Sequence, residues 1–204
     1  MIQKGFFIIT DITGYTIFLT ESELDHAHNI IEALFKSQLA VIAEPLQISN
    51  FQGDAILCHV PEESVQDADL LEQVNAIYDA FAATIEEMQI NPPCGCNACA
   101  NITMLDLKMF MHFGEYLVKK VGETEEIIGS DVITAHRMMK NNVKAATGIH
   151  SYLLATHQAL GQLGVADDAK FIDYTQTFEH IGEISMGVAQ LGTTGGIAYQ
   201  PGSS

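Results

Sequence analysis

Two aspartates stand at places in the sequence where a carboxylate could bind a metal ion. Asp11 follows the apolar run 6–9 and precedes Gly14, and Asp54 lies beside Gly53 in a turn between two further apolar runs. A carboxylate beside buried strands is costly to desolvate unless it is paired or binds a cation. Two such groups, each at a strand–turn boundary, indicate a divalent metal site. The alternative interpretation is that each aspartate only caps its own turn.

Three clustered cysteines offer a second place for metal or thiol chemistry. Cys94, Cys96 and Cys99 form a C-x-C-x-x-C pattern. Three thiolates this close could bind Zn²⁺ with a fourth ligand from His112, from Cys58 or from another subunit. The alternatives are reduced free thiols and a redox-sensing thiol pair.

Three basic or titratable residues on expected helices receive separate interpretations. Arg137 is the only arginine in the chain, and arginine binds phosphate in a bidentate manner better than lysine does. It is therefore a candidate for phosphate chemistry, with a solvated helix residue as the alternative. His26 and His28 have acidic neighbours and are interpreted as solvated side chains.

Bulk composition limits the classes of partner. The formal net charge of the 204-residue chain is −17, which disfavours binding to nucleic acid or to anionic membranes. No apolar run approaches the roughly 18 residues of a membrane helix, and the N-terminus leads into a strand without a signal-peptide cleavage site. We therefore expect a cytoplasmic protein with a single domain over residues 1–192 and a flexible tail over residues 193–204.

The elements that must position these residues begin with an apolar strand over residues 5–10. Helical periodicity follows over residues 24–43, and a hairpin is predicted for residues 46–51 and 55–60 around the Gly-Asp turn. The strongest helical pattern covers residues 64–90.

The second half of the chain predicts shorter elements. Strict alternation indicates a strand over residues 105–113, which Gly114 turns into a partner strand over 116–121, and a helix follows over 129–141. Further strands are expected at 150–155, 171–174 and 178–184. The order predicts an α+β fold with a ferredoxin-like βαββαβ core and a C-terminal extension, in which helices cover one face of a largely antiparallel sheet.

Four motifs in this order resemble a known family. They are Asp-Ile-Thr-Gly-Tyr-Thr at 11–16, Gly-Asp-Ala at 53–55, His-Phe-Gly at 112–114, and the helix segment 128–138, which ends in Ala-His-Arg-Met. The chain thereby resembles the catalytic domains of class III adenylyl and guanylyl cyclases, and more closely a divergent bacterial branch of cyclase-like proteins.

The resemblance implies a site shared by the two subunits of a homodimer. Asp11 and Asp54 would bind divalent ions, Mg²⁺ or Mn²⁺, that hold a nucleoside triphosphate, and Arg137 of the other subunit would stabilise the transition state. The positions implied to contact the nucleotide are Asn50, Glu126, Ile12 and Gly14.

Several residues that cyclases use for catalysis or binding are replaced in this chain, which lowers the cyclase activity expected from it. Ile133 occupies the position of the asparagine that orients the ribose, and no lysine occurs in 182–187, where cyclases bind the triphosphate. Asn50 and Glu126 match neither the adenylyl nor the guanylyl base-selecting set. We therefore expect a homologue that binds a nucleotide and a divalent metal, with cyclase activity weak or lost. The alternatives are an active cyclase and a structural or redox zinc protein that uses the cysteine loop.

Overall fold

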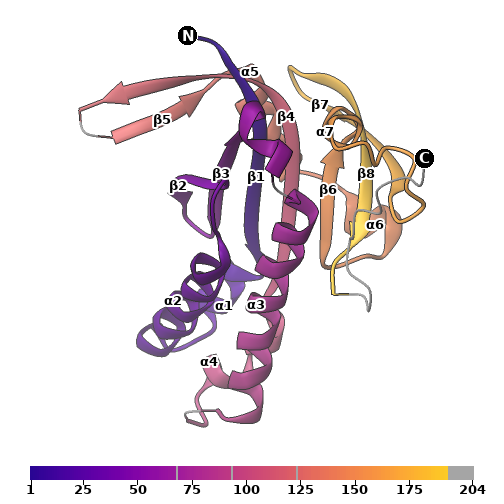
Figure 1. The fold of residues 1–204 in the computed structure, drawn as a ribbon. Helices are drawn as coiled ribbons and strands as arrows, with labels where there is room; N and C mark the ends of the chain where they lie inside the picture. The colour runs from indigo at the N-terminus through magenta and orange to yellow at the C-terminus, as the bar shows by residue number, and fades with distance from the viewer. Residues whose placement is uncertain (68, 93, 123, 193–204) are drawn as a thin grey trace.

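The computed structural model describes residues 1–67, 69–92, 94–122 and 124–192 (Figure 1). The expected tail at 193–204 lies outside these residues. One sheet runs in the order β2-β3-β1-β4-β6-β8-β7, and β5 pairs with β4 outside this path. Within the described residues, no helix is both long enough and apolar enough to span a bilayer.

The elements have the following bounds. The strands are β1 (Gln3–Thr13), β2 (Gln47–Gln52), β3 (Ala55–Pro61), β4 (Asp106–Val121), β5 (Thr124–Ile128), β6 (Tyr152–Thr156), β7 (Ile172–Phe178) and β8 (Gly182–Gln190). The α-helices are α1 (Tyr15–Thr20), α2 (Leu24–Val41), α3 (Leu70–Ile90), α4 (Asn97–Ala100), α5 (Ser130–Met138), α6 (Val143–Thr147) and α7 (His157–Gln162). Two 3₁₀ helices, η1 (Glu62–Asp67) and η2 (Ile102–Met104), complete the set.

The first four strands form the predicted ferredoxin-like core. β1 lies between β3 and β4 and is antiparallel to both, while β2 forms a hairpin with β3. β6 then joins β4 in parallel, and β7 and β8 extend the sheet as an antiparallel pair. The α+β class and the largely antiparallel sheet are thus confirmed.

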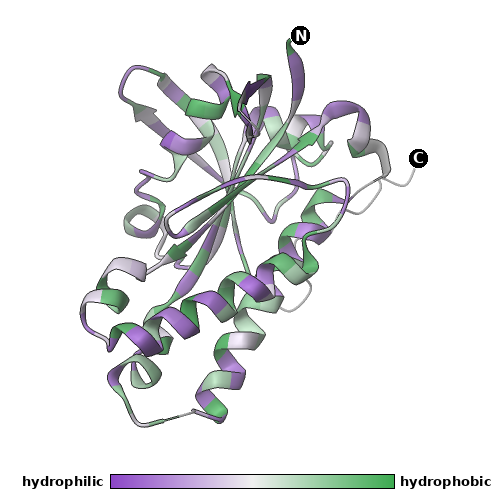
Figure 2. Ribbon diagram, turned by 90° about the vertical axis from the view of Figure 1, so that its left-hand side faces the viewer, coloured by the Kyte–Doolittle hydropathy of each residue, from purple (hydrophilic) through white to green (hydrophobic). Residues whose placement is uncertain are grey.

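The helices are divided between the two faces of the sheet. Phe6 and Ile8 of β1 belong to the core under α2 and α3, whereas Phe7 and Ile9 pack with α5 residues such as Ala135 on the other face. The prediction that helices cover one face therefore holds for the two long helices but is wrong for α5 and α6. β1 is apolar on both faces, and each face has to be covered. Figure 2 shows hydrophobic and hydrophilic residues interleaved along the long helices, as expected for helices with one buried face.

β4 is one continuous strand, which corrects the predicted turn at Gly114. The strand passes through this glycine, and the return strand is β5. A Cβ atom at Gly114 would lie 2.4 Å from atoms of the Asp131 side chain, so the glycine makes room for α5 and does not turn the chain. Residues 115–128, here called the arm, project from the sheet as a two-stranded hairpin (Figure 1).

Two further boundaries differ from the sequence prediction. α3 begins at Leu70 and not near residue 64, because the Asp69 side chain accepts hydrogen bonds from the backbone N–H groups of Leu71 and Glu72. The strand expected at 178–184 instead contains the turn between β7 and β8, where His180 has φ 67°.

Candidate functional site

The end of β1 and the β2–β3 turn bring Asp11 and Asp54 together, and this pair is called the candidate cation site. Asp11 lies opposite Ala55 in the β1–β3 register, and the backbone N–H of Ile12 donates to the carbonyl oxygen of Asp54 at 3.1 Å. Gly53, with φ 63°, supplies the left-handed conformation that the tight turn requires. The predicted hairpin and the predicted proximity of the two aspartates both hold.

The candidate cation site is negatively charged and partly buried. Burial, with the nearby Asp54 carboxylate, raises the pKa of Asp11 to about 6, and Lys108 acts in the opposite direction. Lys108 lies directly opposite Asp11 on β4, and its Nζ is 5.5 Å from the centroid of the Tyr152 ring. The site therefore holds two carboxylates, which are oxygen donors of the kind that Mg²⁺ and Mn²⁺ prefer, with one lysine beside them.

Lys108 is a residue of this site that the sequence analysis did not identify. The alternation of residues 105–113 placed it on a strand, but only the β1–β4 register brings it opposite Asp11. Register between distant strands leaves no local signal in the sequence.

Arg137 lies in the last turn of α5 and is half-buried. Its backbone carbonyl oxygen accepts a hydrogen bond from the N–H of Lys140 at 3.0 Å, but among the described residues none forms an ion pair or hydrogen bond with its guanidinium group. The neighbouring His136 has its Nε2 atom 3.4 Å from Nε2 of Gln52, so this end of α5 reaches the β2–β3 turn. Ile133, on the same helix, is 56% exposed.

Asn50 and Glu126, the positions expected to contact the base, lie on separate strands. Asn50 is on β2, and its Oδ1 accepts a hydrogen bond from Nε2 of Gln52 at 3.3 Å. Glu126 is on the arm opposite Lys119 and lines a hollow between β2 and the arm. No hydrogen bond joins Asn50 to Glu126 within the described part of the chain.

Ile12 and Gly14 have structural roles that restrict how they could contact a nucleotide. The Ile12 side chain is buried in the core under α2 and α3. Gly14 has φ 85°, and a Cβ there would lie 2.4 Å from the carbonyl oxygen of Met104. Any nucleotide contact at these two positions would come from the backbone.

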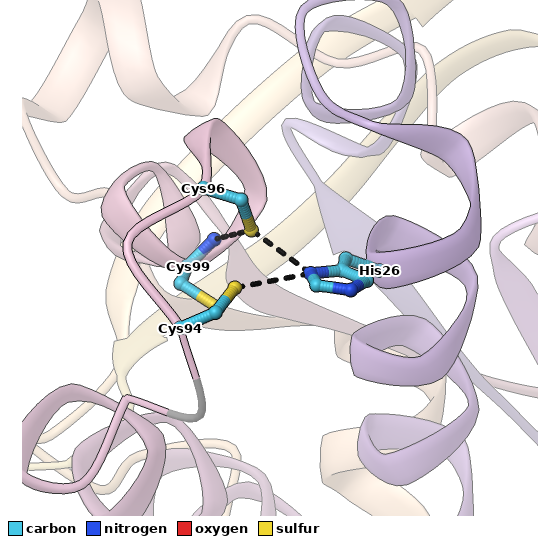
Figure 3. Close-up of side chains that lie close together, drawn as sticks. All are labelled: His26, Cys94, Cys96 and Cys99. Carbon is cyan, nitrogen blue, oxygen red and sulfur yellow. Dashed lines mark hydrogen bonds between the residues drawn. The ribbon is translucent and has the colours of Figure 1, made fainter.

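The cysteine loop closes around a histidine that the sequence analysis interpreted as solvated. Nδ1 of His26 lies 3.1 Å from Sγ of both Cys94 and Cys96, and Sγ of Cys94 lies 3.5 Å from Sγ of Cys99 (Figure 3). The four ligand atoms all lie within 4.8 Å of one another.

The fourth ligands suggested from sequence are not part of this cluster. His112 is buried, with Nδ1 hydrogen-bonded to Oγ1 of Thr156 at 2.9 Å, and Cys58 is buried on β3. Both side chains are occupied in the packing of the sheet, which corrects the expectation for each.

The thiols of the cluster have different acidities. Hydrogen bonds from the Cys94 side chain and the Cys99 backbone, with a contribution from His26, lower the pKa of Cys96 to about 6. Burial raises the pKa of Cys99 to about 11. Cys96 is therefore a thiolate at neutral pH, the form that binds metals and reacts as a nucleophile.

The family described as "Protein of unknown function (DUF2652)" matches residues 28–147, which include Asp54, the cysteine loop and Arg137. The chain belongs to this family. It is also 30% identical over 154 residues to "Uncharacterized protein Rv2561/Rv2562" of Mycobacterium tuberculosis (strain ATCC 25618 / H37Rv), covering 74% of this chain and 69% of that protein.

Solved structures identify the fold. The guanylyl cyclase Cya2 aligns over 94% of both chains with a TM-score of 0.68 and 15% identity. The adenylyl cyclase CyaB from P. aeruginosa aligns over 97% of this chain and 98% of that one, with a TM-score of 0.62 and 16% identity. A class III adenylyl cyclase-like ATP-binding protein from Pseudomonas aeruginosa aligns over 79% of this chain and 35% of its own, with a TM-score of 0.59 and 15% identity. The chain therefore has the fold of class III cyclase domains, as the motifs predicted.

Proposed function

We propose that the chain binds a nucleoside triphosphate together with Mg²⁺ or Mn²⁺ at Asp11 and Asp54, and that its cyclase turnover is weak or absent. The observation that carries this proposal is the register between β1 and β3, which brings both aspartates to the same end of two neighbouring strands. The two negative charges are only partly offset by Lys108. A divalent cation would offset the remaining charge.

The donor chemistry fits such a cation. Carboxylate oxygens from the end of β1 and from the β2–β3 turn are hard ligands, and Mg²⁺ is commonly held by one or two carboxylates plus substrate phosphates. When bound, the cation neutralises phosphate charge and polarises the reacting oxygens. The overall charge of −17 makes this local neutralisation necessary for any anionic ligand.

Weak turnover follows from two positions where cyclases supply contacts and this chain does not. Ile133 is an exposed apolar side chain where the resemblance expects the ribose-orienting asparagine. Residues 182–187 contain no lysine to bind the triphosphate. Loss of one such electrostatic donor costs about 10²–10³ in turnover. The adenylyl cyclase-like ATP-binding protein from Pseudomonas aeruginosa has this fold, which supports ATP binding as a role for it.

A second copy of the chain would complete the proposed site. In cyclases the resemblance places the arginine and the aspartates on different subunits, so Arg137 of the partner subunit would face the nucleotide. Exposed apolar residues are consistent with a homodimer: Val118 and Ile128 on the arm are each about 40% exposed, and Ile133 is more exposed still.

Thermal unfolding with Mn²⁺ and either ATP or GTP tests the proposal. At about 100 times Kd the ligand should stabilise the fold by about 2.7 kcal/mol, or about 5–10 °C in Tm. The shift should disappear in Asp54→Asn and persist in Asp79→Asn, a matched change on the exposed face of α3. Absence of a shift with both nucleotides would contradict the binding proposal. Rapid cyclic nucleotide formation that is lost in Asp54→Asn would contradict weak turnover.

A further inference from the structure

The cysteine loop lies at the end of the helical layer, apart from the candidate cation site. Cys94, Cys96 and Cys99 follow α3, and they face His26 in the first turn of α2 (Figure 3). All four side chains point toward a common centre, and their ligand atoms fall within 4.8 Å of one another. Residues separated by about 70 positions in the chain thus converge on one point.

The ligand types and distances match one metal. Three thiols and one imidazole are a Cys₃His set, which is common in structural zinc sites. Tetrahedral Zn²⁺ with Zn–S bonds of about 2.3 Å places its donor atoms about 3.5–3.8 Å apart. Here the contacts are 3.1 Å from His26 Nδ1 to the Sγ atoms of Cys94 and Cys96, and 3.5 Å between Cys94 and Cys99. The remaining pairs of ligand atoms lie within 4.8 Å, so shifts of about 1 Å or less would bring the four donors to the tetrahedral spacing.

We propose that His26, Cys94, Cys96 and Cys99 bind one Zn²⁺ ion that fastens the loop after α3 to the start of α2. Four protein ligands close the coordination sphere and leave no position for water or substrate, so the ion has a structural role and not a catalytic one. The proposed nucleotide site does not depend on this ion for any of its ligands.

The surroundings of the four ligands also fit a metal site. The backbone N–H of Cys99 donates to Sγ of Cys96 at 3.5 Å, and the backbone N–H of Ala98 donates to Oε2 of Glu23 at 3.2 Å. These contacts fix the loop against α2 in the way that outer hydrogen bonds orient metal ligands.

Burial alone gives the loop little stabilisation. Among the described residues from 91 to 104, only Ala98 and Ile102 are buried. One small alanine and one isoleucine supply little hydrophobic burial for a loop of this length. Metal coordination would therefore be the main interaction that holds the loop.

A disulfide is the competing chemistry for the same thiols. Sγ of Cys94 and Sγ of Cys99 are 3.5 Å apart, whereas a disulfide requires about 2.05 Å. All four cysteines of the chain are free in the structure. Zinc uses all three thiols and the imidazole, while a disulfide uses two thiols and leaves His26 without a role.

The test is zinc stoichiometry and affinity in the full chain, purified under reducing conditions. We expect one Zn²⁺ per chain by elemental analysis, and a tetrahedral thiolate spectrum after exchange with Co²⁺. His26→Gln should weaken zinc binding by more than about 100-fold, since loss of a direct ligand should exceed the 10–100-fold cost of losing an outer partner. His28→Gln, two residues along the same exposed turn, is the matched control and should bind zinc like the wild type.

Several outcomes would overturn the site. They are a reduced protein that takes up no zinc, a disulfide in protein purified with reductant, and a His26→Gln variant that retains wild-type affinity. The Co²⁺ spectrum of the wild type keeps the test decisive if a variant does not fold. Asp54→Asn should leave zinc content unchanged, so failure of the nucleotide proposal and failure of this one are distinguishable.

Discussion

At the scale of single residues, Asp11 illustrates how a binding site can oppose stability. Its carboxylate is half-buried beside Asp54, and its pKa is raised from 3.8 to about 6. The native state therefore binds this proton more tightly than the unfolded state does. Below about pH 4 the protonated Asp11 carboxyl does not oppose folding. As the pH rises through 6 its ionisation lowers the free energy of unfolding. A bound cation would reverse that loss.

We predict that Asp11→Asn stabilises the metal-free protein by about 1–3 kcal/mol at pH 8, because it removes a desolvated charge. At pH 3 the two proteins should be nearly equal in stability, because the wild-type carboxyl is then largely protonated in both the folded and the unfolded state. Urea unfolding at the two pH values measures this difference directly. The same variant should show no stabilisation by Mn²⁺. A variant less stable than the wild type at pH 8 without metal would contradict the account.

His26 shows what could and could not be predicted from sequence at this scale. The three cysteines were identified as a zinc candidate, but their fourth ligand was sought in His112 and Cys58. The position of His26 beside the cysteine loop could have been inferred from the predicted topology, because β1 and β3 are antiparallel and the helix after each strand runs back across the sheet. The start of α2 must then lie beside the end of α3, where the cysteine loop begins. The exposed helical position of His26 gave no local signal of this role.

At the scale of elements, Gly114 allows α5 to pack closely against β4. Asp131, in the first turn of α5, accepts a hydrogen bond from the backbone N–H of Glu115 at 2.7 Å. Its carboxylate also lies 3.7 Å from Nε2 of His112. The space for this contact exists only because Gly114 has no side chain. The His-x-Gly motif thus fixes the helix that carries Arg137.

We predict that Gly114→Ala destabilises the fold by about 1–3 kcal/mol, because the added methyl group overlaps Asp131 at 2.4 Å. Gly161→Ala is the contrasting control. That glycine lies within α7 with nothing inside 4 Å of an added Cβ, so alanine should stabilise the helix by up to about 1 kcal/mol. Chemical denaturation of both variants measures the difference. Equal effects from the two substitutions would refute the close contact with Asp131.

Most elements were predicted where local signals exist, and boundaries were missed where tertiary contacts decide them. The periodicity of α2 and the hairpin around Gly53 were correct because both patterns are local. Gly114 was interpreted as a turn because a glycine between two apolar runs usually is one. Only the approach of Asp131, a residue 17 positions later, shows why this glycine lies inside a strand.

At the scale of the whole molecule, the arm and α5 present apolar surface outside the core. Val118 is 43% exposed on β4, and Ile128 is 41% exposed on β5. The arm projects beyond the sheet (Figure 1), and although Ile127 packs in the core, these two side chains stay partly exposed. A homodimer would cover this surface and bring the partner's Arg137 to the nucleotide.

We predict that Val118→Glu weakens dimerisation by about tenfold or more, because the new charge must be desolvated at the interface. The matched control is Ile172→Glu, an exposed apolar position on β7 at the opposite side of the sheet. Sedimentation equilibrium measures both. A monomeric wild type, or equal loss of dimer in both variants, would contradict the proposed interface.

The fold as a whole was predictable because the order of elements and four spaced motifs agreed with one another. The helix that corresponds to α5 was predicted, but its position on the second face of the sheet was not, and the short α6 was not predicted. Coverage of both faces of β1 could have been inferred from its unbroken apolar run at 6–9, which is typical of a strand buried on both sides.

The most direct test of the central claim is Mn²⁺ binding measured by electron paramagnetic resonance, with and without a non-hydrolysable ATP or GTP analogue. We expect the wild type to bind Mn²⁺, with more bound when nucleotide is present. We expect Asp54→Asn to lose both the binding and its nucleotide dependence, while Asp79→Asn retains them. Mn²⁺ binding that is equal in wild type and Asp54→Asn, or absent from the wild type with either nucleotide, would contradict a nucleotide–cation site at Asp11 and Asp54.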